Sequence, residues 1–342
     1  MALIPLDLPA GVYRNGTDLQ GAGRWRDANL VRWHDNTLRP IGGWRTRSPN
    51  AANAKIRGMH TWMDNVSVRY IAAGTFDKLY YYSSSGARSD ITPTGLTSGN
   101  EDATNPVGYG NTYYGLEQYG VPRQEGSTTV PATSWSLQSW GQNLIACSNS
   151  DGKIYEWALN SAVVAAVIPN APIGNRSVVV TDERFLMALG AGGNPRNLAW
   201  SDREDNTVWT AAATNEAGSI ELQTDGSIQC GVKVQGQTLI LTDTDVHAAT
   251  YSGPPYVFGV ERVGTSCGIV APAAVSVVDL GAMWMGRSSF FSYTGGSVTE
   301  VSCDVSDYVF SDINHSQISK VFSVSNKDFG EIWWFYPSGS SN

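Results

Sequence analysis

The sequence predicts an all-β fold, a β-propeller of about six four-stranded blades. The first observation is composition: the 342 residues include 36 Gly, aromatic residues reach 11%, and charged residues make up only 16%. This mixture suits short strands joined by tight turns and lacks the periodic Lys, Glu, Leu and Ala of long helices. The second is a strand pattern that recurs every ~35–45 residues, a spacing typical of propeller blades. The third is the set of turn signals between the strands, such as SDG and GGNP.

Three segments carry the repeat most clearly. Each contains a strand, a polar turn, a strongly apolar strand, an aromatic strand and a weaker fourth strand. They are residues 56–92 (IRGMHTWM, RYIAAGT, KLYYYSS, ARSDIT), 135–168 (WSLQSWG, NLIACSN, KIYEWAL, AVVAAVI) and 176–211 (RSVVVTD, RFLMALG, NLAWSD, VWTA). Looser copies cover residues 228–263 and 273–301. Packing such sheets around an axis buries their faces, which favours a propeller over the alternative, a pair of β-sandwiches.

The most apolar stretch of the chain is GIVAPAAVSVVDLGAMWMG, from Gly268. Pro272 and Asp279 interrupt it, so it predicts two buried strands and not a membrane span.

The last repeat, residues 320–336, supplies only two strands, KVFSVSN and GEIWWFYP. A ring whose last blade lacks its outer strands leaves an unpaired edge, which favours aggregation. Residues 36–48 (NTLRPIGGWRTRS) are the best candidate for a strand from the other end of the chain that closes the blade. Two alternatives remain: a natural chain that continues beyond Asn342, or a strand from another subunit.

The sequence therefore divides into an N-terminal arm with a candidate blade-closing strand, residues 1–54, and a propeller, residues 55–342. The chain has a net charge of −8, yet residues 1–50 carry seven Arg and four Asp, a net of +3, so the remainder sums to −11. Arginine among tryptophans suits a protein interface, because guanidinium groups stack and form forked hydrogen bonds. The candidate interface residues of the arm are Arg24, Trp25, Arg26, Arg32 and Trp33. A solvated basic arm is the alternative.

An insertion, residues 95–134, separates the first two blades and is rich in Gly, Tyr and Pro. Connections this long are usually functional or disordered. Its tyrosines offer contact area at low entropy cost, which predicts a loop that docks on a neighbouring subunit. The candidate contact residues are Tyr109, Tyr113, Tyr114 and Tyr119. A loose surface loop is the alternative.

Catalytic and metal-binding motifs are weak. GTSCG at residues 264–268 matches the G-x-S-x-G elbow, but Pro272 lies where the required helix should be established. DTDVH at residues 243–247 is better explained as a polar turn. The four His residues lack metal-ligand spacing, and the four Cys residues lack CxxC spacing, so buried thiols are expected. The sequence predicts no enzyme activity, no cofactor and no metal site.

The stretch VGTSCGIVAPAAVSVVDLGAMWMGRSSFFSYTGG (Val263 to Gly296) resembles the propeller proteins at the tail of short-tailed bacteriophages, the tail nozzle or packaged DNA stabilisation family. LPAGVYRNGTD and LRPIGGW near the start, and GEIWWFYPSGSSN at the end, are similar to the same group. The resemblance rests on the spacing of glycines and aromatic residues and carries over no catalytic residue.

The resemblance implies a structural virion protein of the tail, assembled in the host cytoplasm. Members of the group form homo-oligomeric rings, typically hexamers, below the portal and its adaptor. They retain packaged double-stranded DNA and conduct it during ejection without binding it specifically, and a tail needle or tailspike is a further partner. The acidic body suits a wall that does not hold phosphates. The alternatives are a carbohydrate- or receptor-binding propeller that uses aromatic turns such as residues 80–82, and, less favoured, a propeller hydrolase.

Overall fold

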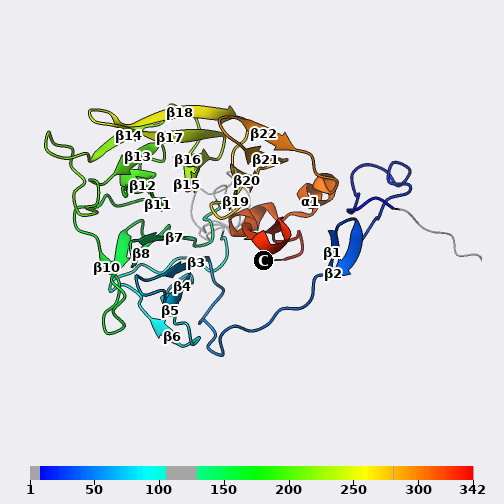
Figure 1. Ribbon diagram of the computed structural model, residues 1–342, viewed down its shortest axis with the longest axis horizontal. Coiled ribbons are helices and arrows are strands. Elements are labelled where there is room, and N and C mark those ends of the chain that lie inside the picture. The colour runs from blue at the N-terminus through cyan, green and yellow to red at the C-terminus, as the bar shows by residue number, and fades with distance from the viewer. Residues whose placement is uncertain (1–7, 105–128, 280, 342) are drawn as a thin grey trace, which may run out of the picture.

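The computed structural model describes residues 8–104, 129–279 and 281–341. It is an all-β propeller of five blades, each a sheet of four antiparallel strands, followed by a two-stranded sheet in the sixth position (Figure 1). The predicted fold class is confirmed, but the prediction of about six four-stranded blades is wrong for the sixth, which has two strands among the described residues.

Each blade is an up-and-down meander whose neighbours in sequence are neighbours in the sheet. Blade 1 is β3 (Gly58–Met63), β4 (Arg69–Gly74), β5 (Leu79–Tyr82) and β6 (Arg88–Asp90); blade 2 is β7 (Trp135–Trp140), β8 (Asn143–Ser148), β9 (Ile154–Trp157) and β10 (Ala166–Val167). Blade 3 is β11 (Ser177–Val180), β12 (Leu186–Leu189), β13 (Asn197–Trp200) and β14 (Gly218–Glu221); blade 4 is β15 (Ile228–Val234), β16 (Gln237–Thr242), β17 (Asp245–Gly253) and β18 (Val257–Thr265). Blade 5 is β19 (Val275–Val278), β20 (Gly281–Met285), β21 (Phe290–Tyr293) and β22 (Val298–Val301).

The remaining elements lie at the two ends of the described chain. A separate hairpin, β1 (Val31–His34) and β2 (Thr37–Pro40), belongs to the arm, and the sixth sheet is β23 (Phe322–Asn326) and β24 (Glu331–Phe335). The helices are short: α1 (Ser306–Asp312) and the 3-10 turns η1 (Ala191–Gly193), η2 (His315–Lys320) and η3 (Lys327–Phe329). None of the described helices is long and apolar enough to cross a membrane.

Three sequence predictions about strands need correction. The fourth strand of blade 3 is Gly218–Glu221, and not the predicted VWTA at residues 208–211. Trp209 lies in the connecting loop, where its indole donates to the Asn206 carbonyl at 2.7 Å. Residues 36–48 do not pair with the sixth sheet, because Thr37–Pro40 pairs with Val31–His34 instead. The two strands predicted from Gly268 onward are confirmed as β19 and β20. β20 is largely buried as predicted, whereas in β19 only Ser276 is buried, so the prediction of burial is wrong for β19.

The first strands of successive blades pack against one another around the axis. His60 in β3 and Lys233 in β15 belong to the first strands of blades 1 and 4. Burial, and secondarily the charge of Lys233, lower the pKa of His60 to about 4, so this imidazole is neutral near pH 7.

Aromatic side chains join adjacent blades. Between blades 1 and 2, the Trp157 and Tyr81 rings stack with centroids 4.5 Å apart. Trp135, the first residue of blade 2, packs its indole against blade 1, where its Nε1 donates to the Thr75 carbonyl at 2.6 Å. A Cβ at Gly74 would come within 2.3 Å of the Trp135 indole, so only glycine admits this ring. Van der Waals packing between blade faces is therefore the main source of stability.

Replacing Trp157 with Ala should lower the free energy of unfolding by about 3–5 kcal/mol, because this side chain is only 1% exposed and leaves a cavity between two blades. Urea denaturation measures the loss. The control is Val66→Ala in the exposed turn after β3, which should change stability by less than about 0.5 kcal/mol. Equal stability of the two variants would refute inter-blade packing as a source of the free energy of unfolding.

Candidate assembly interface

Among the described residues, no strand occupies the outer part of the sector between the sixth sheet and blade 1, and we call it the open sixth sector. The other face of blade 1 packs on blade 2 through a cluster that includes Trp62, Leu79 and Leu144. The face toward the sixth sector has only a small cluster, Ala73, Tyr80 and Tyr82, with Ala52 and Ile71 packed beside it. One face of this blade is therefore well covered and the other is not.

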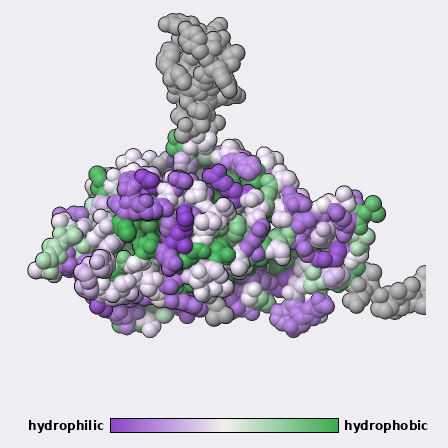
Figure 2. Space-filling model, turned by 90° about the horizontal axis from the view of Figure 1, so that it is seen from above, coloured by the Kyte–Doolittle hydropathy of each residue, from purple (hydrophilic) through white to green (hydrophobic). Residues whose placement is uncertain are grey.

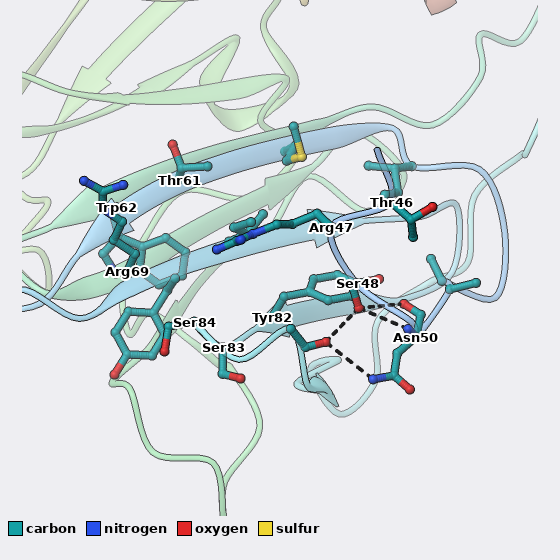
Figure 3. A pocket seen from close by; sticks show the side chains of 18 of the residues that line it. Thr46, Arg47, Ser48, Asn50, Thr61, Trp62, Arg69, Tyr82, Ser83 and Ser84 are labelled. Atoms are coloured by element: carbon teal, nitrogen blue, oxygen red, sulfur yellow. Dashed lines mark hydrogen bonds between the residues drawn. The ribbon is translucent and has the colours of Figure 1, made fainter. Parts of the chain in front are cut away.

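A pocket of about 940 Å³ lies on this open face (Figure 3). The segment at residues 46–52 forms one wall, and Ser48 donates to the Gly86 carbonyl at 2.7 Å to hold it against blade 1. Met59 and Met63 project from β3 into this sector and are 65% and 54% exposed. Arg69 from β4 and Arg47 from the arm also line the pocket. In a four-stranded sixth blade, the outer strands would cover this surface.

The opposite border of the open sector is β24. Among the described residues, β24 pairs with β23 on one edge and has no strand partner on its outer edge. The β1–β2 hairpin faces this edge across a second pocket of about 680 Å³, lined by aromatic side chains that include Trp33, Trp44, Trp333 and Phe335. The predicted closing segment thus lies near the sixth sheet, but side chains and not backbone hydrogen bonds join the two.

Arg32 connects the hairpin to the sixth sheet. Its side chain is only 8% exposed, its Nε lies 3.5 Å from a Glu331 carboxylate oxygen, and its guanidinium lies 3.5 Å above the centre of the Phe329 ring. A buried guanidinium needs such a carboxylate and ring to offset its lost hydration. On the far side of this pocket, Trp44 meets Trp333 edge to face at 5.9 Å.

The start of the arm docks on the turn before α1. The Arg14 amide donates to the Asp304 carbonyl at 2.7 Å, and the Asn15 side chain donates to the Cys303 carbonyl at 2.7 Å. Arg24 pairs with the Asp304 carboxylate at 2.5 Å. The arm is therefore fixed to the side of the ring next to the sixth sheet, as Figure 1 shows at its right end.

Several predicted interface residues have partners within the chain. Arg24 pairs with Asp304, Arg32 with Glu331, and Arg26 with Asp18 at 2.5 Å. The backbone of Trp25 forms a bridge with Val12, and Trp33 lines the pocket beside β24. The structure thus brings Arg32 and Trp33 together and leaves Arg24 and Arg26 on the outer part of the arm. Contact of these residues with another chain stays a prediction. Tyr109, Tyr113, Tyr114 and Tyr119 lie outside the described residues.

The described ends of the insertion, residues 95–104 and 129–134, close the ring by contacting η2. They take the role that the sequence predicts for a closing strand from residues 36–48. The Gln317 side-chain amide donates to the Ala103 carbonyl at 3.0 Å and accepts from the Ala103 amide at 2.9 Å. The Ala132 amide donates to the Ser319 hydroxyl at 3.2 Å, and Thr104 and Val130 form a bridge. The two ends of the insertion are therefore joined to each other and held on η2, just before the sixth sheet.

A buried lysine completes this closure, which we call the η2 clip. Lys320 is 6% exposed in its side chain and donates to Asp102 at 2.5 Å. Arg57, at the start of blade 1, lies 3.2 Å from the same carboxylate and donates to the Glu101 carbonyl at 2.6 Å. The Lys320 hydrogen bond is the main reason that the pKa of Asp102 lies below its usual range. Sequence reasoning missed these residues, since no local pattern links positions 102 and 320.

The candidate catalytic motifs are structural here. Ser266 follows β18 in a turn with φ +55°, no helix follows it, and no hydrogen bond joins it to His315 among the described residues. Asp245 accepts from the Thr224 and Thr242 hydroxyls, and Asp243 accepts from the Ser227 amide at 2.7 Å. The polar-turn interpretation of residues 243–247 is confirmed for Asp243.

The other titratable groups are buried without a catalytic partner. His247 is 3% exposed, and burial is the main cause that lowers its pKa. Cys147, Cys230 and Cys267 are buried free thiols, as predicted, and burial raises the pKa of Cys230 to about 12 and that of Cys267 to about 11. Within residues 8–104, 129–279 and 281–341, no three His, Cys, Asp or Glu side chains cluster to hold a metal ion.

The tyrosines proposed for sugar binding are also structural. Tyr80, Tyr81 and Tyr82 form the buried strand β5 and are 3%, 9% and 8% exposed. They face the interiors of two hydrophobic clusters and cannot stack on a ligand, so this part of the carbohydrate alternative is wrong.

Comparison with known proteins gives likeness of fold only. The chain matches no family model and no curated protein sequence. Similar solved structures include the streptogramin B lyase (12% identity, TM-score 0.42, 90% of this chain and 83% of that one), the BBS1N chain in complex with ARL6DN (14%, 0.45, 99% and 93%) and the virginiamycin B lyase from Staphylococcus aureus (12%, 0.41, 97% and 92%). The chain spans 38% of the extracellular domain of a B. thetaiotaomicron hybrid two component system protein, at 10% identity and a TM-score of 0.43.

Replacing Asp102 with Asn should lower the free energy of unfolding by about 1–3 kcal/mol, because it leaves the buried Lys320 ammonium without its carboxylate. Because the pKa of Asp102 is lowered in the folded protein, its stabilisation is present above the unfolded pKa of about 4 and is lost as pH falls through the folded value. The difference between wild type and variant should therefore be full at pH 7 and should shrink as pH falls below about 4, as followed by urea denaturation across pH.

Lys320→Met is the matched control for this test. It removes the buried cation and leaves Asp102 beside Arg57 and Lys55, so it should destabilise less than Asp102→Asn. A larger loss for Lys320→Met, or a pH-independent loss for Asp102→Asn, would contradict the assigned role of the carboxylate.

Proposed function

We propose that this chain is a structural ring component of a bacteriophage tail, a nozzle that lies below the portal and adaptor, retains packaged DNA and conducts it during ejection. The observation that carries the proposal is the open sixth sector. A propeller that leaves one blade with two strands, one blade face uncovered and an arm docked beside the gap presents a surface suited to another protein chain. The sequence resemblance supplies the identity of the assembly.

The sixth sheet is, in this proposal, the start of a sixth blade that assembly completes. Unpaired sheet edges are the usual acceptors for an added strand, because main-chain hydrogen bonds supply affinity and alternate side chains supply specificity. The free edge of β24 and the exposed Met59 and Met63 provide both elements on the two borders of one gap.

DNA in this proposal passes through a ring of copies and not along the axis of one propeller. The net charge of −11 over residues 51–342 suits a wall that DNA slides past. An acidic wall gains no counterion-release energy from phosphates and therefore does not retain the DNA that it guides.

A carbohydrate-binding propeller is the second candidate. The specific observation in its favour is the pocket beside β24, which Trp33, Trp44 and Trp333 line. Trp44 is 80% exposed. Glycan binding by a monomer, lost on Trp44→Ala, would favour this function over the first.

Electron microscopy of the purified full chain tests the leading proposal. We expect closed rings with a central hole wider than a DNA duplex, because a protein that conducts DNA must enclose it. A protein that stays monomeric at micromolar to millimolar concentration, without added partners, would count against a nozzle.

DNA retention is a separate test of the same proposal. The assembled protein should release duplex DNA in electrophoretic mobility assays even at low salt, where phosphate contacts are strongest. A basic DNA-binding protein of similar size serves as the positive control. Tight retention, weakened by salt, would indicate a nucleic-acid binder and not a conduit.

A further inference from the structure

Residues 36–63 form the most basic segment of the chain. They contain Arg39, Arg45, Arg47, Lys55 and Arg57 and no acidic residue. Lys55 and Arg57 have Asp102 as a partner, whereas no ion pair among the described residues involves the other three, all of which are exposed. Arg39 and Arg45 lie in and just after β2, whereas Arg47 lines the pocket on blade 1.

The register of the β1–β2 hairpin also places two like charges opposite each other. Arg39 lies directly opposite Arg32 in the β1–β2 register, and like charges at such positions are destabilising. Glu331 compensates Arg32 from within the chain, but Arg39 has no such partner among the described residues. The neighbouring Leu38 and Trp44 are 41% and 80% exposed. Arginine and tryptophan in this combination are typical of protein-binding hot spots.

An acidic surface of similar extent lies on blades 3 and 4. The β11–β12 turn of blade 3 contributes Glu183, and the β13–β14 connection contributes Glu204, Asp205 and Glu216. Glu183 and Glu216 both act on the pKa of Tyr251, in blade 4, so these loops meet at one end of the two blades.

Most of these carboxylates lack a cation within the chain. Glu204 pairs with Arg184 at 3.3 Å, whereas no ion pair among the described residues involves Glu183, Asp205 or Glu216. Tyr256, in the β17–β18 turn, is 82% exposed and provides an aromatic anchor on the same blade.

The two surfaces lie at opposite ends of the molecule. Figure 1 shows the β1–β2 hairpin at one end of the longest axis, and the β13–β14 and β17–β18 connections at the other. Figure 2, seen from above, likewise places the arm at one end of the body. Complementary patches at opposite ends join head to tail, and a heterologous contact of this type generates rings when the rotation closes.

We propose that the basic strip Arg39 and Arg45, with Trp44, binds the acidic edge Glu183, Glu204, Asp205 and Glu216 of a second copy of this chain. The inference rests on the proposed function, because it names the contact that would build the proposed ring. The arm thus grips a neighbouring subunit while its own base stays docked on Asp304 and Glu331. Charge complementarity of this kind fixes the partner and its register.

Charge reversal with complementation tests the contact. One variant carries Arg39→Glu and Arg45→Glu, and the other carries Glu183→Arg and Glu204→Arg. Each alone should weaken self-association about 100-fold or more at low salt, because like charges then face each other. Sedimentation velocity measures the assembly. An equimolar mixture should reassemble, since the reversed arm of each copy of the first variant meets the reversed edge of the second.

The matched control is Arg262→Glu and Arg287→Glu, which reverses two exposed arginines away from the arm and from the open sixth sector and should leave assembly unchanged. Rings that form normally from the arm variant would overturn the contact and leave the proposed function intact. A wild-type chain that never assembles would overturn both. Loss of duplex DNA binding by the arm variant, with assembly unchanged, would assign the strip to DNA instead and also overturn the inference.

Discussion

The structure depends on one constraint: a twisted four-stranded sheet must bury both faces, and in a ring each blade relies on its two neighbours to do so. Blades 1 to 5 satisfy this at four contacts, where side chains such as Trp157 and Tyr81 fill the space between sheets. The fifth blade is covered by the sixth sheet, whose Trp334 indole donates to the Ala274 carbonyl at 3.0 Å. Only the outward face of blade 1 lacks a full partner among the described residues. The arm, the two pockets and the η2 clip all lie near this incompletely covered face of blade 1.

Much of the fold could be predicted because the strands alternate and the turns are marked by glycine, asparagine and aspartate. The repeats at residues 56–92 and 135–168 fall on blades 1 and 2, and the predicted pair of strands after Gly268 falls on β19 and β20. The fourth strand of blade 3 was misplaced because Trp209 resembles a strand residue, whereas its indole instead caps a loop at Asn206. Short outer strands carry little periodicity, so local sequence does not separate them from loops.

The candidate interface was less accessible from sequence. Composition identified the arm as basic and aromatic, but it did not reveal that Arg32 is buried against Glu331, about 300 positions away. The alternation of Met59 and Met63 with Trp62 did contain a signal: both faces of β3 are apolar, which indicates a strand meant to be covered on two sides. The contact between Gln317 and Ala103 has no such signal, because an amide that bonds a distant backbone leaves no trace in either local pattern.

The η2 clip also sets an order on biosynthesis. Asp102 leaves the ribosome more than two hundred residues before Lys320, the cation that it needs. Until that lysine appears, blades 1 to 5 can stack only as an arc with two bare ends, and the methionines of β3 face solvent. Contacts of such long sequence separation form late and slowly, so the incomplete ring of the nascent chain is an aggregation-prone intermediate. A chaperone that shields blade 1 during synthesis would protect this protein more than one that acts on the finished ring.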